Sequence, residues 1–296
     1  MNKKILSIYR KSVGKNLKDI SLILKELNIK NLDVFLLYGK LLNSSADNII
    51  NKWLSGKKYC RTYFVQKAFS EIYPKKYIRL SLCIDAMVNI LDDLLDESLN
   101  KKEKVEYVIE FLRIFSIYNK EYPSKKISGL LSRYLNKLIT LAVAESSYQE
   151  KIDYEKNIDK IITNSVDLLI CRGMDIDIFN EIALLGNRNI KKEKTIKDIG
   201  RVFRAINILK KDIKDIEHDK KNNIKTTITS ICSRNDIDFQ FYINSVLKLF
   251  TKKVDLILNR IDLSKNRKKS RFVIPIYNFN KMIKNNQKEI LKIISN

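Results

Sequence analysis

Apolar side chains recur at every third or fourth position over long parts of this chain, a spacing that puts them on one face of an α-helix. The clearest examples run from Ile84 to Leu95, from Ile199 to Ile216 and from Phe239 to Leu258. Glycine and proline, which interrupt helices, number only 7 and 3 among 296 residues. Few breakers in a long chain favour long helices over a many-turned β architecture. The sequence therefore predicts an all-α fold.

The pattern indicates a series of long helices after a helical N-terminal region. These helices are expected at about residues 59–73, 77–98, 102–119, 126–148, 152–185, 195–217, 236–262 and 272–294. The sequence contains no internal repeat and no low-complexity linker that would divide them. We therefore expect residues 1–296 to form one large single-domain helical bundle, with an interior that has room for a substrate or cofactor.

The chain is strongly basic, with 57 lysines and arginines against 34 acidic residues and a formal net charge of +23. This charge fits a protein that binds nucleic acid or an anionic membrane. The basic residues are spread over the whole length, however, and accompany abundant lysine, asparagine and isoleucine. Compositional bias with a solvated surface is therefore the favoured explanation, and no nucleic-acid partner is expected. The positive field would still attract an anionic substrate.

Several classes of protein are disfavoured. The four cysteines show no Cys-x-x-Cys spacing, so neither a zinc site nor a redox motif is indicated. The one histidine, His218, gives weak support for a serine or cysteine nucleophile, which needs a histidine base. No apolar run reaches about 18 residues, and the first residues lack a signal-peptide pattern. We expect a cytoplasmic protein without an integral membrane segment.

The first of two aspartate sets is the sharpest chemical feature. Asp92, Asp93 and Asp96 close the strongly apolar stretch that begins at Ile84. On a helix, Asp92 and Asp96 point to the same side because they are four residues apart. Carboxylates this close repel one another unless a cation lies between them, and oxygen ligands of this kind suit Mg²⁺.

The second set comprises Asp212, Asp215 and Asp219, whose spacing of three and four also puts them on one helix face. A solvated helix end explains a single set about as well as a metal site does. Two sets on apolar helices more than 100 residues apart are harder to explain in that way. If the two helices face each other across a bundle, the sets form two jaws of a clamp for Mg²⁺ and a diphosphate.

The chemistry of diphosphate departure calls for such a layout. Breaking a carbon–oxygen bond to diphosphate creates an allylic cation and a highly charged leaving group, which Mg²⁺ and basic side chains neutralise. Basic residues follow or precede the aspartates at Lys58 and Arg61, at Lys101 and Lys102, and at Lys225. Each basic cluster, taken alone, is more readily explained by an ordinary charged surface.

Three segments of the chain resemble the polyprenyl diphosphate synthase family. LCIDAMVNILDDLLDE, residues 82–97, resembles the first aspartate-rich motif with its preceding helix, and GRVFRAINILKKDIKDIEHDKKNNIKTT, residues 200–227, resembles the second motif with its trailing Lys-Thr. GKKYCR, residues 56–61, resembles the Gly-Lys-Arg-x-Arg-Pro element that holds isopentenyl diphosphate. The resemblance covers roughly residues 55–230.

This resemblance implies a helical bundle of the isoprenoid synthase type with a central active-site cavity. It implies a trans-prenyltransferase that condenses isopentenyl diphosphate with an allylic diphosphate, uses Mg²⁺ and forms a homodimer. Met87 and Val88 lie one turn before Asp92, and since neither is aromatic we expect a product of about C15–C20.

Roles are carried over residue by residue from the resemblance. Asp92, Asp93, Asp96, Asp212, Asp215 and Asp219 would bind Mg²⁺; Lys58 and Arg61 would hold isopentenyl diphosphate; Lys101 and Lys102 would contact the two diphosphates; and Lys225 would contact the allylic diphosphate. Asp92, Asp96 and Lys225 would be the catalytic residues.

Departures from the family pattern bear on the condensation more than on the fold. Lys211 stands where the second motif has its leading aspartate, and Asp85 stands where the family has histidine or glutamine. Proline is absent after Arg61. Three alternatives therefore stay open: a terpene cyclase, a prenyltransferase acting on another acceptor, and a non-catalytic partner subunit.

Overall fold

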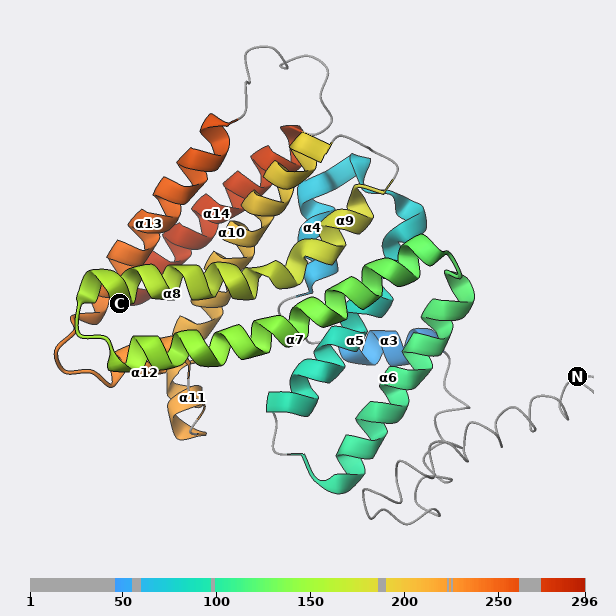
Figure 1. The fold of residues 1–296 in the computed structure, drawn as a ribbon, viewed down its shortest axis with the longest axis horizontal. Helices are drawn as coiled ribbons and strands as arrows, with labels where there is room; N and C mark the ends of the chain where they lie inside the picture. Colours follow the sequence, from blue (N-terminus) through green and yellow to red (C-terminus); the bar gives the residue numbers. More distant parts are fainter. Residues whose placement is uncertain are drawn as a thin grey trace, which may run out of the picture. The chain divides into compact units, whose positions relative to one another are not determined.

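A computed structural model describes residues 46–54, 60–96, 99–185, 190–222, 224, 226–260 and 273–295. Within these ranges the regular structure is helical, with no strand (Figure 1). This finding confirms the all-α prediction. The same part of the chain contains no helix that is both long and apolar enough to cross a bilayer.

Internal contacts group the chain into two compact units. The first comprises Met1–Tyr59 and Leu82–Pro123, and the second comprises Cys60–Ser81 and Ser124–Asn296. The single-domain arrangement over residues 1–296 and the central cavity stay predictions.

The first unit contains α3 (Ala46–Leu54), most of α5 (Ile78–Asp96) and α6 (Lys101–Glu121). A buried carboxylate, Glu110 of α6, joins α6 to α3. It accepts hydrogen bonds from the Nζ of Lys52, at 2.7 Å, and from the indole Nε1 of Trp53. The Trp53 ring also meets Tyr107 edge to face, with ring centroids 4.7 Å apart. Aromatic packing and a satisfied buried acid therefore hold these two helices together.

The second unit is organised around α10 (Ile190–Lys214), which packs against α14 (Val273–Ile294), α8 (Ile158–Arg172) and α13 (Phe239–Asn259) (Figure 1). Phe203 of α10, Phe250 of α13 and Phe279 of α14 are at most 1% exposed. Their burial puts the apolar core of this unit where the three helices meet. The remaining helices are α4 (Arg61–Phe69), α7 (Lys125–Tyr154), α9 (Asp177–Ala183), α11 (Ile216–Lys221), α12 (Thr227–Cys232) and the 3₁₀ segments η1 (Ser70–Ile72), η2 (Lys75–Tyr77) and η3 (Gly173–Ile176).

The predicted single helix over residues 152–185 is wrong. α7 continues to Tyr154, and α8 then starts anew because the Asn157 side chain accepts hydrogen bonds from the backbone N–H groups of Asp159 and Lys160. Asparagine used in this way begins a helix rather than continuing one. α8 itself ends at Arg172 and passes through η3 into α9.

The predicted helix over residues 195–217 also differs from the structure. α10 ends at Lys214, and Asp215 adopts a turn conformation with φ −95° and ψ 4° before α11 begins. The C-terminal helices expected at 236–262 and 272–294 agree closely with α13 and α14. Their strong periodicity on one face explains the agreement.

Gly173 allows η3 to lie directly against α10. A Cβ atom at this position would lie 2.5 Å from the carbonyl oxygen of Arg201 and 3.2 Å from the backbone nitrogen of Ala205. Backbone atoms cannot move aside as a flexible side chain can. Any other residue at position 173 would therefore push the two segments apart.

Gly173→Ala is expected to lower the free energy of unfolding by about 1–3 kcal/mol, because overpacking strains a closely packed contact. Gly129→Ala is the control, since a Cβ there meets only the Arg133 Nη1 atom, at 3.5 Å. The control should be neutral or stabilising by about 0.5–1 kcal/mol, as expected for alanine inside a helix. Urea denaturation of the two variants measures the difference, and equal stability would contradict the close packing.

Candidate functional site

The first aspartate set lies where α5 passes from the protein interior to the surface. Residues 83–90 of α5 are buried, whereas Asp92 is exposed and Asp93 is partly exposed. Asp96 is the last residue of the helix, and its side chain lies outside the described residues. Both residues belong to α5, and their spacing of four puts their Cα atoms on the same side of the helix.

Two polar residues occupy the buried part of α5. Asp85 is 0% exposed and lies almost two turns before Asp92. Asn89 is 6% exposed, and its Nδ2 donates to the backbone oxygen of Trp53 at 3.2 Å. The Asp85 carboxylate, which departs from the family pattern, is thus buried, whereas Asp92 is exposed and Asp93 is partly exposed.

Lys101 and Lys102 are exposed in the first turn of α6. Cations at the N-terminus of a helix oppose the helix dipole. Asn100 and Glu103 offset this cost by forming a capping box, in which each side chain binds the other residue's backbone N–H at 3.0 and 2.9 Å. The cap fixes where α6 begins and so places both lysines five and six residues after the end of α5.

The second aspartate set is divided between different environments. Asp212 is 5% exposed, and its Oδ2 accepts a hydrogen bond from Nη1 of Arg172 in α8 at 2.8 Å. Arg172 also pairs with Glu145 of α7 at 3.1 Å. Burial alone would lower the pKa of Arg172, but the two carboxylates outweigh it and raise that pKa. Asp212 is therefore neutralised by an arginine within the second unit.

The other members of the second set lie around the end of α10. Asp215 is partly exposed, and Asp219 of α11 is 8% exposed with its Oδ1 3.5 Å from Nδ1 of His218. The backbone N–H of Asp219 still donates to the carbonyl of Asp215 at 2.8 Å, which keeps the two residues one helical turn apart. Lys211 is exposed.

Arg61, predicted to hold isopentenyl diphosphate, lies in a buried ion cluster. It is 4% exposed, and its Nε donates to Oδ2 of Asp175 at 2.7 Å. Arg204 of α10 donates to the same carboxylate through Nε at 3.0 Å and Nη2 at 2.8 Å. Burial would raise the pKa of Asp175, but Arg204 and Arg61 outweigh it and lower that pKa. Lys58 and Lys225, the other predicted diphosphate ligands, lie outside the described residues.

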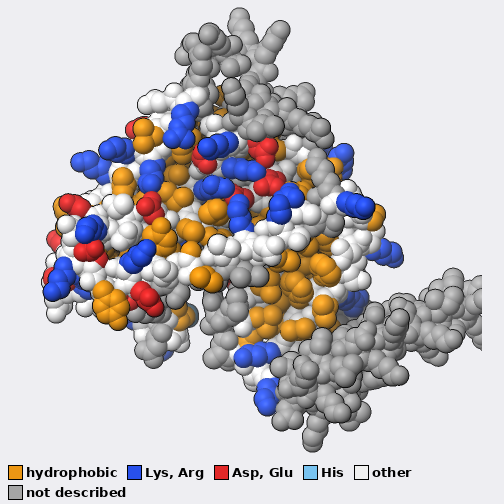
Figure 2. Space-filling view, in the orientation of Figure 1, with side chains coloured by type: hydrophobic (Ala, Val, Ile, Leu, Met, Phe, Trp, Pro, Cys, Tyr) orange, Lys and Arg blue, Asp and Glu red, His pale blue; other side chains and the backbone are white. Residues whose placement is uncertain are grey.

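The Asp175 cluster is one rung of a longer array, here called the ion ladder. Each of its three acids lies between one cation of α10 and one cation of another helix. The rungs are Asp175 with Arg204 and Arg61, Asp177 with Arg201 and Lys137, and Glu181 with Lys197 and Arg133. Figure 2 shows basic and acidic side chains interleaved on the upper part of the face in view.

The ladder was not predicted from the sequence, although a signal for it exists. The cations Lys197, Arg201 and Arg204 follow one another at spacings of four and three, as residues on one helix face do. Their partners Asp175, Asp177 and Glu181 lie in an earlier segment and follow one another at spacings of two and four. Periodicity alone gives no means of pairing the two segments.

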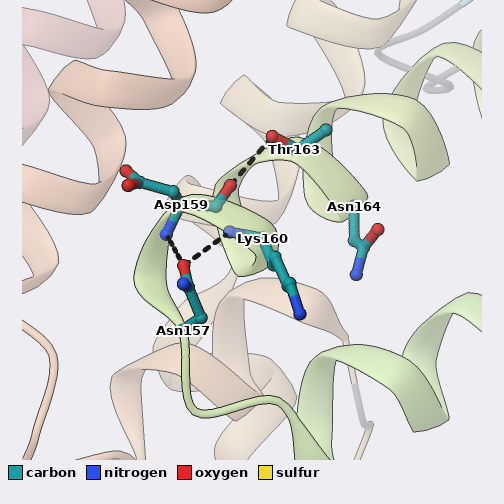
Figure 3. A pocket seen from close by; sticks show the side chains of 5 residues that line it. All are labelled: Asn157, Asp159, Lys160, Thr163 and Asn164. Carbon is teal, nitrogen blue, oxygen red and sulfur yellow. Dashed lines mark hydrogen bonds between the residues drawn. The ribbon is translucent and has the colours of Figure 1, made fainter.

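A polar pocket lies at the start of α8, lined by Asn157, Asp159, Lys160, Thr163 and Asn164 (Figure 3). The Asn157 side chain already accepts from the backbone N–H groups of Asp159 and Lys160 at 2.9 and 3.2 Å. The pocket walls come from a single helix and are polar. This pocket therefore lacks the apolar walls that an isoprenoid chain requires.

Within the described residues, no three histidine, cysteine, aspartate or glutamate side chains lie close enough together to hold a metal ion. Comparison of the chain with protein-family models, with curated proteins and with solved structures gives no match.

Asp175→Asn is expected to lower the free energy of unfolding by about 3–5 kcal/mol at neutral pH, because two buried guanidinium groups lose their counter-charge. Asp167→Asn is the control: its side chain is 42% exposed and pairs with Lys253 at 3.1 Å. An exposed pair contributes about 1 kcal/mol or less. Similar losses in the two variants would show that the buried rung does not stabilise the fold.

The same experiment has a defined pH dependence. The pKa of Asp175 is lower in the folded chain than in the unfolded one, where an aspartate titrates near about 3.9. Its stabilisation is therefore present above about pH 5 and is lost as the pH falls through the folded pKa. The stability gap between wild type and Asp175→Asn should shrink in that acid range, as measured by urea denaturation at stepped pH.

Proposed function

We propose that this chain is a class I isoprenoid synthase that removes diphosphate from an allylic diphosphate with the aid of Mg²⁺ and transfers the prenyl group to isopentenyl diphosphate. The observation that carries the proposal is the end of α5, where a buried apolar helix opens into Asp92, Asp93 and Asp96. The all-helical fold is compatible with it.

Electrostatics at the end of α5 favours a cation there. The C-terminus of a helix is the negative end of its dipole. Carboxylates in the last turns therefore make the electrostatic potential there still more negative. α5 has three aspartates in its last five residues and no basic residue in its last turn. Carboxylate oxygens are suitable ligands for Mg²⁺, which would relieve this repulsion when bound.

The second aspartate set fits Mg²⁺ less fully. Asp212 is engaged by Arg172, and Lys211 replaces an acid. Asp215, with Asp219 one turn later, is left as the ligand that this set would offer. A bound Mg²⁺ would neutralise the charge that develops on the departing diphosphate.

The basic residues of the proposal would act on the diphosphate groups directly. Lys101 and Lys102, exposed at the start of α6, supply fixed positive charge in the unit that carries the first aspartates. Lys225 would contact the allylic diphosphate, and Lys58 would hold isopentenyl diphosphate, as the family resemblance implies. The resemblance assigns Arg61 to isopentenyl diphosphate as well, but Arg61 is buried and bound to Asp175, so it would have to leave that carboxylate to take this role. A homodimer belongs to the same proposal, as the resemblance implies. So does a product of about C15–C20, because Met87 and Val88 precede Asp92 and neither is a bulky aromatic that would shorten the chain that fits.

The Arg172–Asp212 pair favours a second candidate, a non-catalytic partner subunit of such an enzyme. In this pair, Arg172 of the protein itself binds Asp212, a carboxylate that the second motif would otherwise offer to Mg²⁺. The buried Asp85 favours another variant of the proposal, because a carboxylate there would repel a second diphosphate. That variant is a terpene cyclase, or an enzyme that prenylates another acceptor.

A product assay separates these candidates. The purified chain is incubated with Mg²⁺ and farnesyl or geranyl diphosphate, with and without isopentenyl diphosphate, and the products are separated by chromatography. We expect a longer diphosphate only when isopentenyl diphosphate is present, and no turnover when the metal is chelated. Hydrocarbons or alcohols from the allylic substrate alone would identify a cyclase. If no substrate is consumed, the result would favour the non-catalytic partner subunit.

Asp92→Ala and Asp96→Ala are each expected to lower kcat at least about 100-fold, since a metal ligand contributes several kcal/mol of charge stabilisation. The melting temperature should change little, because the helix loses repulsion at its C-terminal end. Asp255→Ala is the matched control, since Asp255 is an exposed aspartate on α13. Full activity in either α5 variant would show that these carboxylates do not hold the metal.

A further inference from the structure

α14 presents a line of lysines on the side opposite its buried face. Its buried residues include Ile276, Phe279, Ile283 and Ile290, and the helix packs against α10. Lys281, Lys284, Lys288 and Lys292 follow one another at spacings of three and four and are all exposed. They form a continuous line about 16 Å long, given the rise of an α-helix. We call these four residues the lysine face.

Among the residues that the structure describes, no acid balances the positive charge of the lysine face. Glu289, the acidic residue of α14, is bound instead by the Nζ of Lys210 at 3.2 Å. Within the described residues, no ion pair joins any of the four lysines to an acid. The ion ladder on α10 differs, because every cation there has a carboxylate within 4.0 Å. The lysine face therefore carries a field that an anionic partner would neutralise.

α13 extends the basic surface. The Nε2 of Gln287 in α14 donates to the Oγ1 of Thr251 in α13 at 3.1 Å, which holds the two helices side by side. Lys248 and Lys252, which adjoin this contact in α13, are both exposed.

α4 borders the other side of α14, since Nδ2 of Asn278 donates to the backbone oxygen of Ala68 at 2.9 Å. α4 adds the exposed residues Lys67 and Tyr63, whose ring centroid is 6.0 Å from the Lys67 Nζ. α14 itself adds Tyr277, which is 66% exposed, and Leu291, which is 42% exposed. Apolar and aromatic groups are thus placed among the lysines.

We infer that the lysine face, together with the bordering parts of α13 and α4, docks on the surface of an anionic lipid bilayer. Lysines on an outward-facing helix are attracted to anionic headgroups, each contributing about a factor of five in partitioning. Exposed tyrosine and leucine side chains suit the boundary between headgroups and acyl chains. The four residues of the line are all lysines, without an arginine fork, and lie on the outer side of a packed helix, whereas nucleic-acid grooves combine arginine with stacked aromatics. This inference does not depend on the proposed enzymatic function.

The test compares two variants of the full-length chain that have the same net charge. The first neutralises the lysine face with K281Q, K284Q, K288Q and K292Q. The second, a matched control, neutralises four exposed lysines on other elements with K75Q, K151Q, K156Q and K194Q. Each lowers the formal net charge from +23 to +19, by four removed lysine charges. Circular dichroism verifies that both variants keep the helical fold.

Binding is measured by sedimentation with phosphatidylcholine vesicles that contain about 30% phosphatidylglycerol, at about 0.1 M salt. The lysine-face variant should lose at least about tenfold in its partition coefficient, and the scattered control should stay within about twofold of wild type. An equal loss in the control would overturn the inference, because net charge alone would then explain binding. Absence of vesicle binding by the wild type would also overturn it, as would binding of an oligonucleotide through this face instead of vesicles.

Discussion

The second unit depends on burying carboxylates that are each shared by two cations. Asp175 and Asp177 are 7% and 1% exposed, and an ionised group so far from water is strongly unfavourable unless hydrogen-bonded charges surround it. The ion ladder meets this condition with cations from α10, α4 and α7. A shift of η3 and α9 by one turn along α10 would leave carboxylates beside the wrong partners. The ladder therefore fixes the register of these short segments, which Gly173 brings within backbone contact of α10.

The two aspartate motifs differ in their electrostatic surroundings. The first accumulates negative charge at the end of α5, where the helix dipole adds to it. The second has one carboxylate already neutralised, because Arg172 reaches Asp212 from α8. A divalent cation would gain more from the first motif than from the second. The end of α5 would therefore bind a divalent cation more strongly than the second motif.

Periodicity predicted the helices well where a single apolar face decides the structure. α13 and α14 have this character, and their expected ranges agree with the observed ones to within a few residues. It did not predict the break at Asn157, where a polar side chain captures backbone N–H groups, nor the start of η3 at Gly173. Both depend on local or tertiary hydrogen bonding and packing rather than on hydrophobic pattern.

Residue spacing could not predict ion pairs between residues far apart in the chain. Arg61 stands 114 residues from Asp175, and Arg172 stands 40 residues from Asp212. A motif identifies a basic or acidic residue at a plausible position, but only the fold determines whether its charge is already matched. The lysine face is the opposite case. The sequence shows the spacing of its lysines, but only the structure shows that they lack counter-charges within the described residues.

The placement of the chain's one tryptophan has a practical consequence. Trp53 lies in the first unit, 3% exposed, with its indole bound to the Glu110 carboxylate. Its emission wavelength and quenching therefore report on the environment of that unit, whereas the far-ultraviolet dichroism signal comes mainly from the longer helices of the second. Intrinsic fluorescence thus reports on the first unit and dichroism mainly on the second, and non-coincident transitions would reveal independent melting.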